Sequence, residues 1–380
     1  MTPYYARNGV VIYCADCRDV LPTLGPFKSI ITDPPYHLTS VSRKGSSRTN
    51  DPASPFGRHR IGERGFMGKT WDGGGVSFDP ETWLSVLEAA KPGAMLLSFG
   101  GTRTWHRIAA AIEDAGWEIR DTICWLYGSG FPKSLNIGKS AGRAEWEGWG
   151  TALKPAFEPI IVAMKPLDGT FAENALAHGV AGLNIDGCRI GENPGYRYNA
   201  DKNGTTFHGQ QGERIRQTAD KKGAQFIEST KGRWPANLIL DDEAAALLDE
   251  QSGKTVSRAA PRGGTSPNPM SWGQVRADGQ EMAGHTDSGG ASRFFYCAKA
   301  SCSERGEGND HPTVKPLALM RYLCRLTKTP SGGLVLDPFM GSGSTLLAAR
   351  LEGRPCIGIE KDERTCEIAV KRLEQLENVA

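Results

Sequence analysis

Residues 333 to 349 read GLVLDPFMGSGSTLLAA, and this stretch decides the fold class. A short apolar run ends at Asp337, a turn containing Gly341 and Gly343 follows, and small apolar residues then continue at helical spacing. This pattern predicts a strand, a tight turn and a helix of a parallel sheet. Ligands of such sheets bind beyond the carboxyl ends of the strands, so we expect a ligand at this turn.

The chemistry of the turn narrows the choice of ligand. It lacks the third glycine of a dinucleotide fingerprint and the lysine of a P-loop. Glu360 ends the next apolar run, 23 residues after Asp337, where an acid commonly binds ribose hydroxyls. A ligand with a ribose and no pyrophosphate is indicated, and S-adenosylmethionine meets that description. A turn that needs its glycines for geometry alone is the alternative.

Strand and helix patterns alternate at both ends of the 380-residue chain, which is typical of a parallel sheet with crossover helices. The expected strands are residues 10–14, 29–32, 94–100, 117–127, 159–165, 236–241, 333–337 and 355–360. The expected helices are residues 80–91, 103–116, 316–328, 343–353 and 362–377. Strands 117–127 and 159–165 are expected to pair antiparallel at an edge of the sheet. Residues 168 to 293 are rich in Gly, Ser and Asn and break this alternation.

Composition excludes several classes of protein. No run of 18 apolar residues occurs, and the N-terminus lacks a signal-peptide pattern, so we expect a soluble cytoplasmic protein without a membrane partner. The nine cysteines are scattered along the chain. Cys14 and Cys17 form a CxxC, but no second pair follows at metal-binding spacing. We therefore predict free thiols and no metal site.

A second motif lies near the N-terminus, where residues 29 to 39 read SIITDPPYHLT. Pro34 and Pro35 hold their φ angles near −65° and donate no N–H, so they make a rigid, extended exit from the preceding strand. This exit fixes the direction of the Asp33 carboxylate and the Pro34 carbonyl. Two hydrogen-bond acceptors aimed at one point suit an NH₂ group.

Together, DPPY (33–36) and DPFMGSGST (337–345) resemble the motifs of the amino-methylating DNA methyltransferases, which methylate adenine N6 or cytosine N4. The order of the motifs resembles the β group of that family. The resemblance covers about residues 8–165 and 294–377 and includes HPTVKP (311–316). It implies an α/β, Rossmann-like S-adenosylmethionine-dependent methyltransferase sheet that is circularly permuted: the chain starts on the third strand and ends with the first two.

The resemblance also implies a division of the chain. Residues 1–167 would form the catalytic half of the methyltransferase domain and residues 294–380 its cofactor-binding half. Residues 168–293 would be an inserted, loop-rich target-recognition region.

The cofactor contacts implied by the resemblance fall at both ends of the chain. The residues on the methionine side would be Asp337, Phe339, Gly341, Gly343 and Ser344, with Thr313 and Lys315 near the methionine carboxylate. Glu360 would bind the ribose, Asp16 the adenine amino group, and Cys17 would supply a backbone contact. Asp16 has a second interpretation as the N-cap of a following helix.

For catalysis, the resemblance implies that the target base is flipped out of double-stranded DNA. The residues assigned to this step are Asp33, Pro34, Pro35 and Tyr36. Asp33 and the Pro34 carbonyl would accept hydrogen bonds from the amine, and Tyr36 would stack on the base. The nitrogen would attack the methyl group directly, without a covalent enzyme intermediate or a metal.

Positive charge supports a DNA partner, since residues 37–70 carry seven Lys/Arg against two acids and residues 189–234 carry nine against five. The predicted DNA contacts are Arg43, Lys44, Arg58, Arg60, Lys69, Arg189, Arg197, Lys221, Lys222, Arg233 and Trp234. The aspartate of DPPY favours adenine N6. An N4-cytosine enzyme, a catalytically silent DNA-binding protein, and a methyltransferase for RNA or a glutamine amide are the alternatives. The sequence leaves a homodimer, a restriction endonuclease partner and a phage or host origin open.

Overall fold

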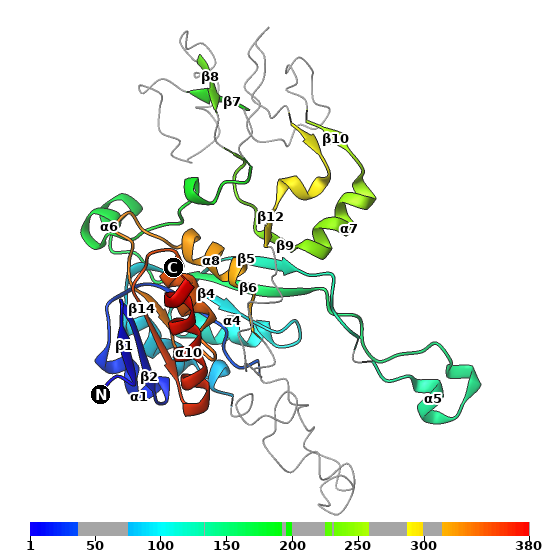
Figure 1. The fold of residues 1–380 in the computed structure, drawn as a ribbon, viewed down its shortest axis with the longest axis horizontal. Helices are drawn as coiled ribbons and strands as arrows, with labels where there is room; N and C mark the ends of the chain where they lie inside the picture. Colours follow the sequence, from blue (N-terminus) through cyan, green and yellow to red (C-terminus); the bar gives the residue numbers. More distant parts are fainter. Residues whose placement is uncertain are drawn as a thin grey trace, which may run out of the picture. The chain divides into compact units, whose positions relative to one another are not determined.

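The computed structural model describes residues 1–36, 75–132, 134–191, 195–199, 225–229, 232–257, 287–298 and 314–379 (Figure 1). The chain forms two compact units. The first unit contains Met1–Cys188, Asn237–Ala244 and Cys297–Ala380, and the second contains Arg189–Ala236 and Ala245–Tyr296. The predicted boundaries at residues 168 and 293 stay a prediction.

A ten-stranded sheet carries the fold. In spatial order its strands are β1 (Tyr5–Arg7), β2 (Val10–Cys14), β14 (Cys356–Glu360), β13 (Val335–Asp337), β3 (Phe27–Thr32), β4 (Ala90–Phe99), β6 (Phe157–Met164), β5 (Glu118–Leu126), β9 (Leu238–Asp241) and β12 (Tyr296–Ala298). The five strands from β2 to β4 in this order are mutually parallel. β1 is antiparallel to β2, and β6 is antiparallel to both β4 and β5.

The strand order confirms the predicted permutation. β13 and β14, from the end of the chain, lie between β2 and β3, from its beginning. The register pairs Val335 with Ser29 on one side of β13 and with Cys356 on the other. Counting from β13, β14 is the second strand in space, and β2, the first parallel strand of the chain, is the third.

Strands β5 and β6 pair antiparallel as predicted, but their predicted place at the edge of the sheet is wrong. β9 pairs parallel with β5 through Cys124 and Leu238, and β12 follows β9 in the sheet. The sequence expectation failed because β9 comes from a short apolar island inside an otherwise polar segment.

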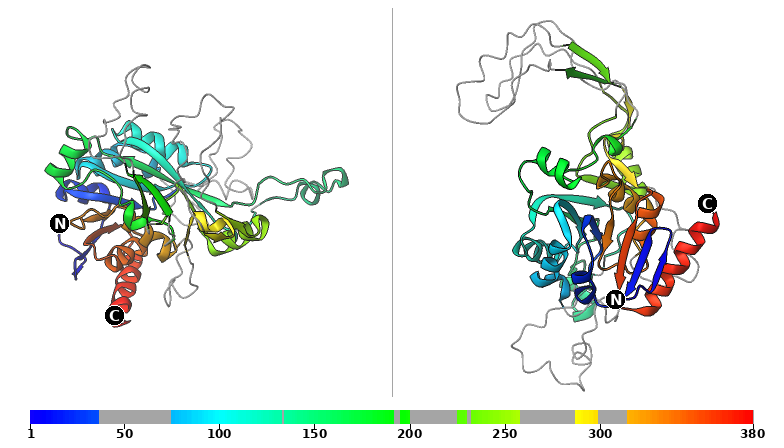
Figure 2. Two further views of the ribbon diagram at one scale, coloured as in Figure 1. Left: turned by 90° about the horizontal axis from the view of Figure 1, so that it is seen from above. Right: turned by 90° about the vertical axis from the view of Figure 1, so that its left-hand side faces the viewer.

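The helices fill the connections between the strands. They are α1 (Cys17–Val20), α3 (Pro80–Glu88), α4 (Trp105–Asp114), α5 (Ile137–Ala141), α6 (Phe171–His178), α7 (Asp242–Ser252), α8 (Leu317–Leu326), α9 (Ser344–Leu351) and α10 (Glu363–Val379). Figure 2 shows α10, in red, beside the blue N-terminal strands. Among the described helices, none is long and apolar enough to cross a membrane.

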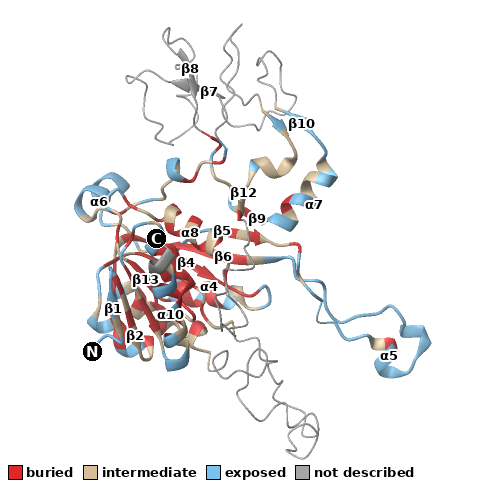
Figure 3. Cartoon of the chain, viewed as in Figure 1, coloured by how far each residue is buried: buried red, intermediate tan, exposed pale blue. Residues whose placement is uncertain are grey.

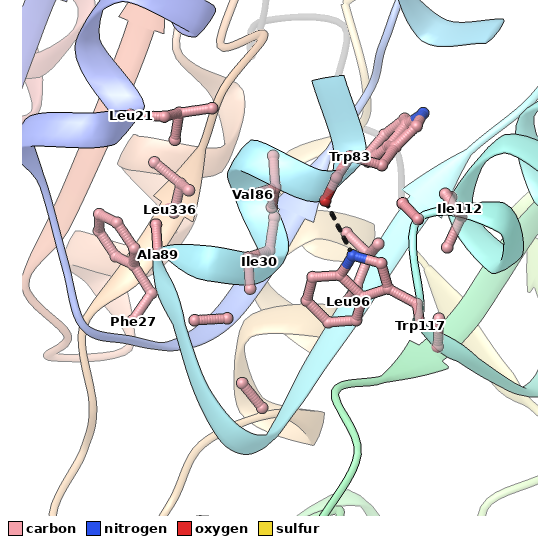
Figure 4. Packing of buried hydrophobic residues seen from close by; sticks show 14 of the residues in the cluster. Leu21, Phe27, Ile30, Trp83, Val86, Ala89, Leu96, Ile112, Trp117 and Leu336 are labelled. Atoms are coloured by element: carbon pink, nitrogen blue, oxygen red, sulfur yellow. Dashed lines mark hydrogen bonds between the residues drawn. The ribbon is translucent and has the colours of Figure 1, made fainter. Parts of the chain in front are cut away.

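The core of the first unit lies around β3, β4 and α3, where buried side chains are continuous (Figures 3 and 4). Trp83 and Trp117 are its largest fully buried side chains. The Trp117 indole Nε1 donates to the Trp83 carbonyl over 3.1 Å, and the Trp83 Nε1 donates to the Ser77 carbonyl over 2.9 Å. These bonds satisfy the polar atoms of both indoles and link the core to the short 3-10 helix Val76–Phe78, which contains Ser77.

The second unit is built from short antiparallel pairs, β7 (Gly195–Asn199) with β8 (Gln225–Ser229) and β10 (Thr255–Val256) with β11 (Ser288–Gly289). Partly buried ion pairs join its segments. Asp287 pairs with Arg233 and, over 3.0 Å, with Arg293. These contacts connect the segment that contains Arg233 to the segment that contains Asp287 and Arg293. They also lower the pKa of Asp287 to about 2, chiefly through the hydrogen bond from Arg233.

Candidate active site

The tetrapeptide Asp33 to Tyr36 leaves the carboxyl end of β3 and is anchored by its own backbone. The Ser77 hydroxyl donates to the Pro35 carbonyl over 2.5 Å, and the Thr104 hydroxyl donates to the Tyr36 carbonyl over 2.8 Å. Because Ser77 is itself held by Trp83, the tetrapeptide is tied to the hydrophobic core. In the described part of the chain, no donor bonds to the carbonyl of the buried Pro34.

The Asp33 carboxylate is held on both of its oxygens. Its Oδ1 accepts from the Tyr36 hydroxyl over 2.6 Å, and its Oδ2 accepts from Lys315 Nζ over 2.7 Å. A carboxylate has about four acceptor positions, so these two bonds orient Asp33 and still leave room for a substrate N–H. Lys315 comes from the segment before α8, 282 residues away.

Lys315 binds a second acid that the sequence analysis did not single out. Glu158, at the start of β6, lies 3.2 Å from Lys315 Nζ and 3.2 Å from the Tyr36 hydroxyl. The Lys315 side chain is 7% exposed, while those of Asp33 and Glu158 are each 23% exposed. Burial alone would lower the pKa of Lys315, but the two carboxylates raise that pKa above its ordinary value.

Tyr36 is an integral member of this group. Burial, followed by the charges of Asp33 and Glu158, raises the pKa of Tyr36 well above its ordinary value, so its hydroxyl stays protonated and serves as a donor. Lys315 Nζ also lies 5.4 Å from the centroid of the Tyr36 ring and 4.9 Å from that of Phe99. The stacking of Tyr36 on a flipped base stays a prediction.

The predicted ligand turn adjoins the tetrapeptide. Asp337, at the end of β13, is 2% exposed and accepts from the Thr32 hydroxyl over 2.7 Å and from the Phe339 N–H over 3.1 Å. Burial raises the pKa of Asp337 to about 7, although hydrogen bonds from Thr345 and Thr32 oppose this shift. Thr32 immediately precedes Asp33, so one hydrogen bond joins the two motifs across 305 residues of sequence.

The turn itself depends on its glycines and on an arginine. Gly341 and Gly343 have φ of 48° and 82°, and a Cβ on Gly343 would lie 3.0 Å from the Ala369 Cβ. The buried Arg372 of α10 donates through Nη1 to the Ser342 carbonyl over 2.6 Å and to the Ser344 hydroxyl over 3.1 Å. The predicted cofactor residue Ser344 is thus held by Arg372, a side chain that no sequence motif marks.

The other predicted cofactor residues lie at the ends of β14, the neighbour of β13, and of β2, the strand next to β14. Glu360 ends β14, and its Oε1 accepts from the Asp362 N–H over 2.9 Å. Burial raises the pKa of Glu360. Asp16 follows β2 and caps α1 by accepting from the Arg18 N–H over 3.0 Å, while the Arg18 Nη2 lies 2.8 Å from its Oδ2. The N-cap interpretation of Asp16 matches this geometry, and Cys17 is buried beside it.

Several predicted sites lie outside the described residues: Thr313, Arg43, Lys44, Arg58, Arg60, Lys69, Lys221 and Lys222. Arg197 lies in β7, of which only the backbone is described. In the second unit, Arg233 is 9% exposed and pairs with Asp287, so its charge is already partnered. Trp234 is 64% exposed, and the Arg189 guanidinium lies 5.3 Å from its ring centroid.

The cysteines offer no evident chemistry at this site. Burial raises the pKa of Cys17 to about 12 and raises that of Cys356 further. The described residues contain no group of three or more His, Cys, Asp or Glu side chains placed to hold a metal ion. The ionisable groups that stand together at the site are the carboxylates, the lysine and the tyrosine around Asp33.

Comparison with known proteins identifies the family to which this chain is similar. Residues 27–371 match the model of the N6/N4 methyltransferase family, described as DNA methylase. The Type II methyltransferase M.HindIII of Haemophilus influenzae is 25% identical over 301 residues, which are 77% of this chain and 65% of that protein. M.ScaI of Streptomyces caespitosus is 46% identical over 77 residues, which are 20% of this chain and 24% of that protein. The chain thus covers less than two thirds of these relatives.

Two solved structures are similar in a more distant way. The M1.HpyAVI–SAM complex is 17% identical, with a TM-score of 0.42 over 96% of this chain and 99% of that one. The cytosine-N4-specific PvuII DNA methyltransferase is 13% identical, with a TM-score of 0.47 over 97% of this chain and 88% of that one. The family match spans both the tetrapeptide and the glycine turn. The chain therefore belongs to the DNA methylase family of N6 and N4 amino methyltransferases.

Proposed function

We propose that this chain is a site-specific DNA methyltransferase that transfers the methyl group of S-adenosylmethionine to the exocyclic N6 of adenine. The observation that carries the proposal is the bond between Thr32 and Asp337, which joins the Asp33–Tyr36 acceptor site to the glycine turn. A methyl acceptor and a methyl donor must meet within bonding distance. Neighbouring parallel strands that end in these two motifs provide such a meeting point.

The residues at the ends of β13, β14 and β2 fit the cofactor. Two of the three residues in the Gly341–Gly343 turn have no Cβ, and Glu360 ends the adjacent strand, where its carboxylate suits a ribose diol. The turn has no lysine for a phosphate, which favours a ligand without one. When bound, S-adenosylmethionine supplies an electrophilic methyl group on a sulfonium. The cofactor roles of Asp16, Cys17, Thr313 and Asp337 stay predictions.

The acceptor site accounts for activation of the amine. An exocyclic amine is a weak nucleophile because its lone pair is delocalised into the ring. Hydrogen bonds from its two N–H groups to Asp33 and the Pro34 carbonyl favour a pyramidal nitrogen with a localised lone pair. Pro35 and the anchors from Ser77 and Thr104 keep these acceptors fixed, so catalysis comes from positioning and electrostatics.

A base inside a duplex cannot reach these acceptors, so the proposal includes base flipping, with unstacking costing a few kcal/mol. Tyr36 follows the acceptors directly and is the candidate for stacking on the extruded base. In the second unit, the exposed Trp234 with Arg189 over its ring combines an aromatic face with a cation, a pairing suited to nucleic acid. The relatives M.HindIII and M.ScaI are Type II methyltransferases, which supports a site-specific DNA substrate.

Mass spectrometry of nucleosides tests this proposal. Unmethylated bacterial DNA is incubated with the protein and S-adenosylmethionine, digested to nucleosides and analysed. We expect N6-methyladenine and no N4-methylcytosine among the nucleosides. N4-methylcytosine in its place would move the target to cytosine, and DNA binding without either product would identify a catalytically silent DNA-binding protein.

A further inference from the structure

We propose that Glu158 is a positioning residue for methyl transfer, which shares the Lys315 ammonium with Asp33 and so keeps negative charge on Asp33 for the substrate amine. The inference rests on the proposed function and adds a residue that no motif marks. It also gives Lys315 a role at the acceptor site, distinct from its predicted contact with the cofactor.

The geometry assigns each proton of the ammonium an acceptor. Lys315 Nζ lies 2.7 Å from Asp33 Oδ2, 3.2 Å from Glu158 Oε2 and 3.2 Å from the Tyr36 hydroxyl oxygen. An ammonium group has three donors and no acceptor, so these contacts saturate it. The Tyr36 proton then goes to Asp33, its nearer carboxylate, over 2.6 Å.

Counting formal charges shows why the second acid matters. Asp33 and Lys315 alone would form a neutral pair, and its acceptor would be weak for a neutral amine. With Glu158 the formal charge of the three side chains is one net negative charge, in a site that is largely shielded from water. Charges at such sites interact more strongly than charges in bulk solvent.

The proposed reaction places new positive charge next to this group. The amine nitrogen forms a bond to the methyl carbon while the carbon–sulfur bond breaks with its electron pair on sulfur. The positive charge thus passes from sulfur to nitrogen, and the extra proton on nitrogen then leaves to water. A net negative group beside the nitrogen stabilises the positive charge that develops there. This electrostatic interaction is therefore stronger in the transition state than in the ground state.

Glu158→Gln keeps the size of the side chain and removes its charge. We expect kcat to fall roughly 10- to 100-fold, with KM for S-adenosylmethionine unchanged within about threefold. Glu118→Gln, on the neighbouring strand β5, is the matched control because its side chain is 46% exposed and pairs with Arg120. We expect this control to retain wild-type kcat.

The double variant Glu158→Gln with Lys315→Met separates positioning from a merely structural role. It leaves Asp33 as the single charge of the group, which restores the net charge of the wild type. We therefore expect its kcat to exceed that of Glu158→Gln alone, although a second side chain has been removed. A purely structural Glu158 predicts a further loss, because both buried contacts would then be missing.

These measurements distinguish the present inference from the proposed function. A wild-type protein that methylates no DNA would overturn both. A wild-type protein that is active, with a Glu158→Gln variant of equal kcat or a double variant less active than Glu158→Gln, would overturn this inference alone. Thermal unfolding of each variant in parallel confirms that the kcat values refer to folded protein.

Discussion

The Thr32 hydroxyl donates a 2.7 Å hydrogen bond to the buried Asp337 carboxylate, and this bond joins the strand that ends in DPPY to the strand that ends in the glycine turn. Both residues stand at the carboxyl ends of adjacent parallel strands, β3 and β13. The bond fixes the position of the acceptor site relative to the glycine turn. In the proposed reaction, small shifts between the two motifs would separate the donor and the acceptor of the methyl group.

Thr32→Val removes this bond while keeping the branched shape of the side chain. Because Asp337 is buried, losing one of its donors should lower the free energy of unfolding by about 1–3 kcal/mol. We also expect weaker binding of S-adenosylmethionine, measured by calorimetry. Thr122→Val, on β5, is the matched substitution away from the site. Unchanged stability and affinity in Thr32→Val would show that the bond is dispensable.

Asp337→Asn tests the raised pKa of this carboxyl group. The folded protein binds the Asp337 proton more tightly than the unfolded chain does. The wild type therefore loses stability as the pH rises from about 4, the ordinary pKa of an aspartate, to about 7, the pKa of Asp337 in the folded protein. The variant has no proton to lose. The free energy of unfolding of the variant, relative to that of the wild type, should therefore increase by about 2–3 kcal/mol between pH 5 and pH 8.

Urea unfolding at several pH values, without cofactor, measures this difference. Asp19→Asn, at an exposed position of α1, is the control for the substitution. A constant difference between Asp337→Asn and wild type across this pH range would contradict the assignment of the shift to burial.

Arg372→Met tests the clamp on the glycine turn. Its Nη1 donates to the Ser342 carbonyl and the Ser344 hydroxyl, so its loss should loosen the turn that we propose binds the cofactor. We expect the Kd for S-adenosylmethionine to rise about tenfold, which corresponds to about 1.4 kcal/mol. Lys371→Met, at the adjacent exposed position of α10, should bind like the wild type. Equal affinity of Arg372→Met and wild type would remove Arg372 from the cofactor site.

Tyr36→Phe separates the hydroxyl of Tyr36 from its ring. The hydroxyl orients Asp33, so kcat should fall roughly tenfold while DNA affinity is kept. Tyr36→Ala also removes the ring and should weaken DNA binding if the ring stacks on the base. Tyr4→Phe, at a surface position, serves as the control. A Tyr36→Phe variant with wild-type kcat would show that Asp33 needs no support from the hydroxyl.

Most of the sheet could be predicted from sequence because apolar strands followed by polar turns have a clear period. The strand predicted at 10–14 matches β2 at both ends, and the strand at 29–32 has the same end as β3. The permuted order followed from the motif order, since both motifs must end neighbouring strands. The place of β9 was not predictable, because a four-residue strand in a polar segment carries no sign of its partner.

Some residues of the candidate site could also be predicted from the sequence, and others could not. Asp33 and Tyr36 stand in a motif whose prolines predict rigidity, whereas Glu158 precedes an ordinary apolar strand and looks like its solvated end. Only the antiparallel pairing of β6 between β4 and β5 brings it to Lys315. Arg372 lies in an amphipathic helix, where an arginine normally marks the solvent face. Tertiary contacts between distant segments decided both cases, and local sequence carries no record of them.

Asp33→Ala tests the central claim most directly, in a single-turnover assay of labelled methyl transfer to DNA with cofactor affinity measured in parallel. Asp33 is predicted to be the acceptor that activates the amine, so its loss should abolish measurable transfer while the Kd for S-adenosylmethionine stays within about threefold. Near-normal transfer by Asp33→Ala would contradict the account, because the amine would then react without the carboxylate that the structure holds between Tyr36 and Lys315.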